Sequence, residues 1–241
     1  MGRCSKISAS LACLVLVATP VAAKEFEPRN EYEALTQRPK SHPAIPPQFS
    51  EIIRDASPDR LLVNGLHGNT IEVDISWYEP RDFLMLAGSR YLGFAYTGYE
   101  AFGFVLVDRA MSGAAAILDT GSYPMLSPDG RYLAAAELSP SGYGNLNGIA
   151  LWEINPDQTV RRFFTDALLE AWGWRVDGWS GSECAVVSGI GAEWQPGSEE
   201  EWKTMWETAP RLTLELRVNE NAVSLVHVDR ENACYSPSPY E

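Results

Sequence analysis

Two similar nine-residue segments lie 41 positions apart in this chain, and this repeat constrains the fold more than any other feature. The first copy is GSRYLGFAY at 88–96 and the second is DGRYLAAAE at 129–137, so the triplet Arg-Tyr-Leu recurs at the same place in both. A weaker third copy begins at WSGSECAVVSG, residues 179–189. Further short apolar segments follow each copy. Self-similarity at a period of about 40 residues is typical of a repeat architecture.

The segments inside each repeat have the pattern of β-strands. Ile71, Val73 and Ile75 alternate with polar residues, and this period of two is typical of a strand with one buried face. Turn residues separate the later apolar runs, which are expected as strands at 90–96, 103–108, 114–119, 131–137, 149–154, 159–164, 184–189, 211–218 and 222–228. We therefore predict an all-β chain: a small propeller-like or incomplete propeller of about three to four antiparallel blades. An open, dimerised or sandwich-like variant is the alternative.

The composition divides the chain into four parts. Residues 1–23 combine a basic start at Arg3 and Lys6, a short apolar run and a small-residue exit, which predicts a secretory signal peptide cleaved after Ala23. The apolar run is too short to span a hydrocarbon core of about 30 Å. We therefore expect a periplasmic or secreted protein, with lipidation at Cys13 as a minor alternative. The other parts are a Pro-rich arm at 24–60, a propeller-like domain at 61–230 with an insertion at 191–210, and a C-terminal tail at 231–241.

The net charge limits the partners that the protein can bind. The formal charge of the full chain is −13, and removal of Arg3 and Lys6 with the signal peptide takes it to −15. Such a surface repels phosphate backbones and anionic lipid headgroups. We therefore expect no nucleic-acid partner and no membrane insertion after cleavage. Another protein is the first expectation for a partner, and a carbohydrate is the second.

Two cysteines, Cys184 and Cys234, remain after cleavage of the signal peptide. In an oxidising compartment two remaining cysteines most simply form a disulfide. Closing a loop of about 50 residues would stabilise the fold by roughly 4 kcal/mol in the chain-entropy model. Two buried free thiols are the alternative.

One stretch resembles a known repeat. LSPDGRYLA at 126–134, followed by GIALWEI and TVRRFF, resembles the PD40 or WD40-like repeat of TolB-type periplasmic propeller proteins. Its Ser127-Pro128-Asp129-Gly130 segment is expected to form a tight turn in which glycine takes a positive φ angle. The match covers one blade of about 40 residues. Domains with such repeats serve as binding platforms and as lids or scaffolds of enzymes, so the resemblance implies a fold and leaves the function open.

The mature chain offers few residues for catalysis or metal binding. His42, His67 and His227 are scattered, and no nucleophile motif accompanies them. His67, in the sequence GLHGN, is the best catalytic candidate, although a hairpin turn is the simpler interpretation. The histidine and cysteine spacings match no zinc motif, no EF-hand pattern occurs, and Asp129 is expected to be structural. We predict no catalytic residue, no metal ligand and no cofactor, while 32 acidic residues leave a carboxylate pair for glycoside hydrolysis open.

One segment of the insertion has a helical pattern. In residues 198–209, Trp202 and Trp206 lie four positions apart, and Ser198 with Glu201 forms a capping box. A helix here would place the two tryptophans on one face, where they contact either the propeller or a partner.

Tryptophan is concentrated in the second half of the chain, where seven of eight lie between residues 152 and 206. Because large aromatic residues are favoured at binding sites, we predict a contact surface of Trp194, Trp202, Trp206 and Tyr143, the last from the loop at 141–148. Filling the core of the last blade is the alternative. The predicted function is an extracytoplasmic, non-enzymatic binding or interaction module. The alternative is a small hydrolase or carbohydrate-binding protein with a Trp-rich face and nearby carboxylates.

Overall fold

A computed structural model describes residues 42–98, 102–137, 146–165, 171–219, 222–228 and 234. Contacts divide the chain into a unit at 1–38 and a unit at 39–241, and every described residue belongs to the second unit. The predicted signal peptide and most of the predicted arm therefore lie outside the described residues. In the described part, no helix is long and apolar enough to cross a membrane.

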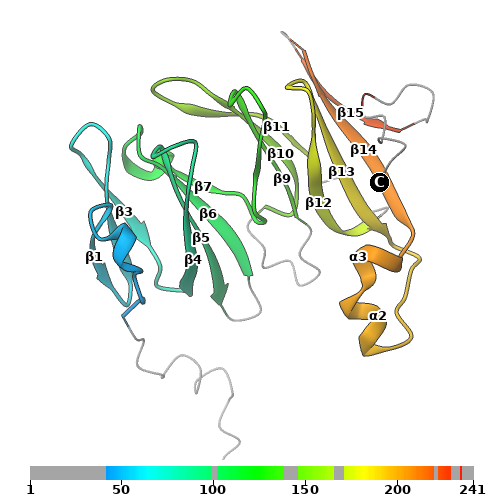
Figure 1. Ribbon diagram of the computed structural model, residues 1–241, viewed down its shortest axis with the longest axis horizontal. Helices are drawn as coiled ribbons and strands as arrows, with labels where there is room; N and C mark the ends of the chain where they lie inside the picture. The colour runs from blue at the N-terminus through cyan, green and yellow to red at the C-terminus, as the bar shows by residue number, and fades with distance from the viewer. Residues whose placement is uncertain are drawn as a thin grey trace, which may run out of the picture. The chain divides into compact units, whose positions relative to one another are not determined.

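The described chain is built from four antiparallel sheets, which confirms the all-β, propeller-like prediction (Figure 1). Sheet 1 has three strands and the other sheets have four, and within each sheet the strands lie in chain order. Sheet 1 contains β1 (Ile53–Ser57), β2 (Arg60–Asn64) and β3 (Thr70–Asp74), after the 3-10 turn η1 (Pro47–Phe49). Sheet 2 contains β4 (Tyr78–Leu86), β5 (Tyr91–Gly98), β6 (Phe102–Asp108) and β7 (Ile117–Asp119), with the 3-10 turn η2 (Gly113–Ala116) before β7.

The second half of the chain forms the other two sheets and the helical insertion. Sheet 3 contains β8 (Met125–Leu126), β9 (Tyr132–Glu137), β10 (Gly148–Ile154) and β11 (Thr159–Thr165). Sheet 4 contains β12 (Ala171–Ser180), β13 (Cys184–Gly191), β14 (Arg211–Val218) and β15 (Val223–His227). Between β13 and β14 lie two short helices, α2 (Glu199–Lys203) and α3 (Met205–Thr208). The backbone N–H of Glu201 donates to Ser198 Oγ at 3.2 Å, as the capping pattern predicted.

Neighbouring sheets pack face to face through three apolar cores. Val73 and Phe94 belong to the core between sheets 1 and 2, and Leu106 and Leu133 to the core between sheets 2 and 3. Leu216 belongs to the core between sheets 3 and 4. Among the described residues, none of these cores joins sheet 4 to sheet 1, so the four sheets form an open series.

The position of a sheet in this series explains the pattern of its strands. β3 belongs to the first sheet and has one solvent-facing side, so its buried and exposed residues alternate. β5 lies between sheets 1 and 3, with Phe94 facing the first and Tyr91 facing the other. A strand that is buried on both faces reads as a continuous apolar run, which accounts for the segments RYLGFAY and RYLAAAE.

The repeated Arg-Tyr pair occupies the same structural place in two sheets. Tyr91 begins β5 and Tyr132 begins β9, each the second strand of its sheet. Arg90 and Arg131 each lie over the ring of the tyrosine that follows, at 5.3 Å from the centroid. The third copy leads into β13, again a second strand. The sequence period therefore corresponds to one sheet.

The turn before β9 has the predicted geometry. Gly130 has a φ of 74°, and its N–H donates to the carbonyl of Ser127 at 2.9 Å. Ser127 Oγ donates to Asp129 Oδ1 at 2.7 Å and accepts from the N–H of Tyr132 at 2.9 Å. Asp129 is therefore part of the turn itself.

The predicted disulfide is present between Cys184 and Cys234. It holds Cys234 against the outer face of sheet 4, where the N–H of Cys234 donates to Glu215 Oε1 at 2.7 Å. Ser180 Oγ donates to the carbonyl of Cys234 at 2.6 Å. These contacts attach the predicted C-terminal tail to the last sheet.

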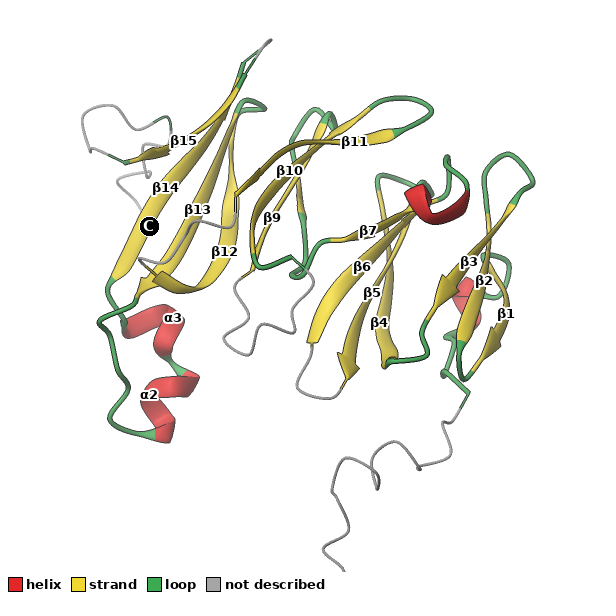
Figure 2. Cartoon of the chain, turned by 180° about the vertical axis from the view of Figure 1, so that it is seen from behind, coloured by secondary structure: helices red, strands yellow, loops and turns green. Residues whose placement is uncertain are grey.

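The sheets have two distinct ends, and the figures place α2 and α3 at the end where β5 and β9 finish (Figures 1 and 2). We call this the loop end; it includes residues 75–77, 119–124 and 146–148. The opposite end, the turn end, includes residues 65–69, 109–116 and 155–158. The two ends carry different chemistry.

Candidate functional site

Two acids and two tyrosines lie at the loop end of sheets 2 and 3, and the two tyrosines pack in the core between sheets 1 and 2. Asp119 ends β7, Glu137 ends β9, Tyr96 lies near the end of β5, and Tyr78 begins β4. We call these four residues the carboxylate–tyrosine cluster. The charge of Asp119 acts on the other three residues, because it contributes to the raised pKa of each of them.

Glu137 is the most unusual member of the cluster. The residue is only 6% exposed, and its Oε2 has no hydrogen-bond partner in the described part of the chain. Burial, and then the charge of Asp119, raise the pKa of Glu137 to about 7. The carboxyl group can therefore give up or take up a proton near neutral pH, as a general acid or base must.

The space around Glu137 depends on two neighbouring segments. Gly121 has a φ of 67°, and a Cβ at this position would collide with Glu137 Oε2. Leu146, 4% exposed, lies beside Gly121, and the next residue, Asn147, also has a positive φ of 44°. Glycine at 121 thus leaves room for the buried carboxylate.

The two tyrosines extend the cluster toward sheet 1. Their ring centroids lie 4.4 Å apart. Burial and the charge of Asp119 raise the pKa of both Tyr78 and Tyr96 well above the ordinary value, so both hydroxyl groups stay protonated at physiological pH. Each hydroxyl group can therefore donate a hydrogen bond.

Large aromatic side chains are exposed at the same end. Trp77 is 78% exposed in the turn between β3 and β4, and Phe102 is 56% exposed at the start of β6. Tyr123 is 48% exposed and packs edge-on against Phe104 at 5.3 Å, while Phe164 is 40% exposed near the end of β11. We call Trp77, Phe102, Tyr123 and Phe164 the aromatic rim.

The predicted contact surface of the insertion is described only in part. Trp206 is half-buried, with its ring beside Gly173 and under the guanidinium of Arg175, 4.3 Å from the ring centroid. Trp194 is also half-buried. Tyr143 and the side chain of Trp202 lie outside the described residues. The surface stays a prediction.

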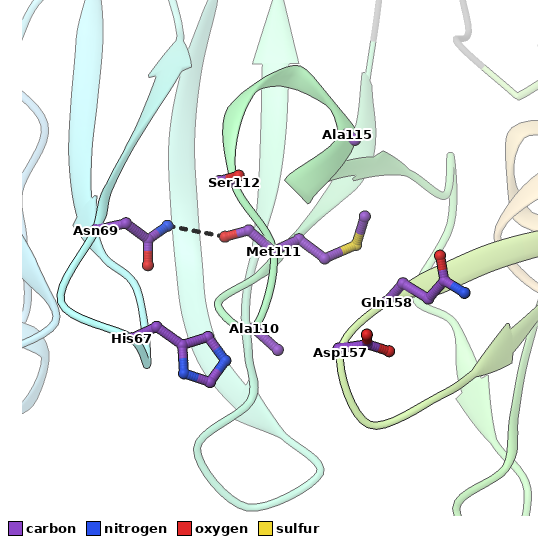
Figure 3. A pocket seen from close by; sticks show the side chains of 8 residues that line it. All are labelled: His67, Asn69, Ala110, Met111, Ser112, Ala115, Asp157 and Gln158. Atoms are coloured by element: carbon purple, nitrogen blue, oxygen red, sulfur yellow. Dashed lines mark hydrogen bonds between the residues drawn. The ribbon is translucent and has the colours of Figure 1, made fainter.

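A second group of residues lines an open cavity of about 530 Å³ at the turn end (Figure 3). Its walls come from sheets 1, 2 and 3 and are formed by His67, Asn69, Ala110, Met111, Ser112, Ala115, Asp157 and Gln158. Exposed His67, the best histidine candidate in the sequence, is one of these residues. His42 lies apart, with its ring nitrogen Nδ1 3.0 Å from the carbonyl of Ala56.

The described residues bring together one trio with metal-ligating atoms, Cys184, Glu215 and Cys234. The two sulfur atoms are joined in the disulfide, and Glu215 accepts hydrogen bonds from Arg217 and from the N–H of Cys234. This trio is a structural contact. The predicted absence of metal ligands stays a prediction.

No family model matches the chain, and no curated protein matches it. Among solved structures, it is similar to a protein from Bacteroides fragilis assigned as a 6-phosphogluconolactonase, with 8% identity and a TM-score of 0.38. A second, from Bacteroides uniformis with the same assignment, has 12% identity and a TM-score of 0.33. The matches cover 72% and 73% of this chain, and 52% and 51% of the solved ones. The chain thus spans about half their length, and the likeness concerns the fold alone.

The comparison corrects one expectation. The prediction of a non-enzymatic binding module is wrong, because both similar structures are assigned as lactonases, which are hydrolytic enzymes. No residue role is transferred from these structures to this chain.

The positions of the two acids in the sequence, rather than the number of acidic residues, could have indicated the carboxylate–tyrosine cluster. Asp119 and Glu137 each end an apolar run, in AAAILD and RYLAAAE. Asp119 ends the fourth strand of sheet 2 and Glu137 ends the second strand of sheet 3. In an antiparallel sheet the second and fourth strands run in the same direction, so acids that end them lie at the same end of the sheets. Trp77 was missed because it stands apart from the seven tryptophans in the second half of the chain.

Proposed function

We propose that this protein is a small hydrolase that cleaves a C–O bond at a sugar ring, with its active site at the loop end. The observation that carries the proposal is the buried carboxyl group of Glu137, which has an unpartnered oxygen beside Asp119. A buried carboxyl oxygen without a hydrogen-bond partner destabilises the fold, so its presence calls for an explanation. A role in acid catalysis is the explanation that we propose.

In the proposed reaction Glu137 is the general acid. Its proton moves to the departing oxygen as the C–O bond breaks, and a water molecule adds its hydroxyl to the ring carbon. The second proton of that water returns to the Glu137 carboxylate. Asp119 would stabilise the positive charge that develops on the ring carbon, and the hydroxyl groups of Tyr78 and Tyr96 can donate to ring oxygens.

The aromatic rim supports a sugar as the substrate. Sugar rings have an apolar face that stacks on exposed aromatic side chains. Trp77 is 78% exposed, and a tryptophan with this exposure contributes little to a core. The rim residues come from the β3–β4 turn, from β6, from the β7–β8 loop and from β11, all at the end that holds the two carboxylates.

The test is hydrolysis by the mature chain of two substrate series, 4-nitrophenyl glycosides and sugar lactones. Turnover of at least one compound above the buffer rate is expected. Glu137→Gln should lower the rate by about 100-fold or more, as expected for loss of a general acid. The rate should fall above pH 7, because the pKa of Glu137 is about 7 and only the protonated form donates.

Glu153→Gln is the matched control, because Glu153 lies in the same sheet on β10 and pairs with Arg162 at 3.4 Å. It should leave the rate unchanged. The proposal is abandoned if neither series is hydrolysed, or if Glu137→Gln retains the wild-type rate. The glycoside and lactone arms decide between the two kinds of bond.

We also propose that the protein is exported, with residues 1–23 as a cleaved signal peptide, and that sheet 3 is a PD40-type repeat. The Cys184–Cys234 disulfide supports an oxidising compartment. The tight turn at Ser127–Gly130 supports the repeat. Mass spectrometry of the mature protein should find Lys24 as its first residue, and an N-terminus at Met1 would contradict export.

A further inference from the structure

We infer that the cavity at the turn end is a second binding site, which takes a small molecule with an ammonium group on a short apolar chain. This inference is independent of the proposed hydrolase activity, because the cavity and the carboxylate–tyrosine cluster lie at opposite ends of the strands. Its volume of about 530 Å³ lies within the range typical of small-molecule sites.

The walls of the cavity are held in place before any ligand binds. Asn69 Nδ2 donates to the carbonyl of Met111 at 2.9 Å, which ties the β2–β3 turn to the loop after β6 (Figure 3). The N–H of Leu66 donates to the carbonyl of Arg109 at 2.7 Å. The N–H of Thr159 lies 3.3 Å from Met111 Sδ, which ties the β10–β11 turn to the same loop. All three walls are thus connected.

A buried ion pair reinforces this connection. Asp108 is fully buried and accepts two hydrogen bonds from Arg90, at 2.9 and 2.8 Å, and one from Thr159 Oγ1 at 2.6 Å. Arg90 also donates to the carbonyl of Asn155 at 2.5 Å. Arg109, 8% exposed, donates to the carbonyls of Asn64 and Ser89, both at 2.7 Å. Both guanidinium groups therefore hydrogen-bond to backbone carbonyls around the cavity and hold its loops in position.

The lining favours a cationic ligand with a short apolar part. Asp157 is the one carboxylate among the described lining residues, and neither lysine nor arginine is among them. Ser112 and Gln158 can hydrogen-bond to the donors of an ammonium group. Met111, Ala110 and Ala115 offer an apolar surface for a short carbon chain. The cavity is open and most of its lining side chains are exposed, so a small ligand can reach the carboxylate and the apolar surface together.

The test compares three probes of the same chain length by NMR at constant pH: n-butylamine, n-butanol and butyrate. Butylamine should shift the side-chain signals of His67 and Gln158 in a saturable way, and the other two should not. Asp157→Asn should weaken butylamine binding about two- to fivefold, as expected for loss of one exposed counter-charge. Asp82→Asn removes an exposed acid of sheet 2 outside the cavity and should not weaken it.

A pair of neighbouring alanines gives a steric control. Ala115 lines the cavity and Ala114 does not, although both are exposed in η2. Ala115→Trp should abolish the butylamine shifts, while Ala114→Trp should preserve them. The inference is overturned if butanol or butyrate binds as well as butylamine, or if Ala115→Trp binds like the wild type. Glu137→Gln should bind butylamine normally, which separates this result from the hydrolase proposal.

Discussion

Two buried acids at opposite ends of the sheets show how differently one fold can use a carboxylate. Asp108, at the turn end, is fully buried and accepts hydrogen bonds from Arg90, Thr159 and the N–H of Ala110. Glu137, at the loop end, is 6% exposed and has an oxygen without a partner among the described residues. Hydrogen bonds therefore compensate the burial of the Asp108 carboxylate, whereas the burial of Glu137 Oε2 is not compensated in this way.

The difference indicates which acid is structural and which is available for chemistry. A buried charge that is fully paired holds neighbouring elements in place, as Asp108 does for the loops around the cavity. Burial raises the pKa of a carboxyl group that has an unpartnered oxygen, and such a group can exchange a proton near neutral pH. The same comparison predicts that the two positions respond in opposite ways to substitution.

The largest effect is expected for Asp108→Ala. Removal of this carboxylate leaves Arg90, whose side chain is 14% exposed, without its ion-pair partner. Loss of one member of a buried pair costs about 3–5 kcal/mol of unfolding free energy. Urea denaturation at pH 7 measures it, and a loss below about 1 kcal/mol would show that Asp108 does not stabilise the turn end.

A smaller effect of opposite sign is expected at Glu137. Because the pKa of Glu137 is about 7 in the folded protein and 4.5 ordinarily, the folded state binds the proton more tightly. Stability from this group is therefore present below pH 4.5 and is lost as the pH rises to about 7, by about 3 kcal/mol in total. Glu137→Gln should remove this loss and be more stable than the wild type at pH 8.

Urea denaturation of both proteins from pH 5 to pH 8 measures the two slopes. Parallel curves for the wild type and Glu137→Gln would mean that the carboxyl group titrates normally. Glu153→Gln, at the other end of the same sheet, should follow the wild-type curve.

The smallest effect on stability is expected for Trp77→Ala in the aromatic rim. Because Trp77 is 78% exposed, its loss should change the unfolding free energy by less than about 0.5 kcal/mol. Trp174→Ala, at a site 4% exposed, should cost about 3–5 kcal/mol. If Trp77 contacts a sugar, KM should rise in Trp77→Ala while stability stays constant; an unchanged KM would remove Trp77 from the substrate site.

Much of the fold could be predicted from short stretches of sequence. The alternation at Ile71, Val73 and Ile75 predicted β3, and the Ser127–Gly130 turn has the expected hydrogen bonds. The Arg-Tyr-Leu repeat predicted equivalent strands, and the pairing of Cys184 with Cys234 is confirmed. Each of these depends on residues close in sequence or on the number of cysteines.

Continued past Ile75, the same alternation would place the Trp77 side chain in the core, but Trp77 is 78% exposed. β3 ends at Asp74, and the N–H of Tyr78 donates to the carbonyl of Ile75 at 3.2 Å, which closes a turn. Trp77 lies on the outside of this turn. The alternation of apolar and polar residues cannot show where a strand ends when the residues after the strand continue to alternate.

By itself, the sequence determined the strands, the repeat, the tight turn, the disulfide and the acidic net charge, because these follow from local periodicity, turn chemistry and composition. Only the tertiary structure decided which acidic residue in the described part of the chain has a buried carboxyl oxygen without a hydrogen-bond partner, and which loops line a cavity. The physical reason is that the pKa of Glu137 depends on the packing of Gly121 and Leu146 and on the charge of Asp119, which distant segments bring together.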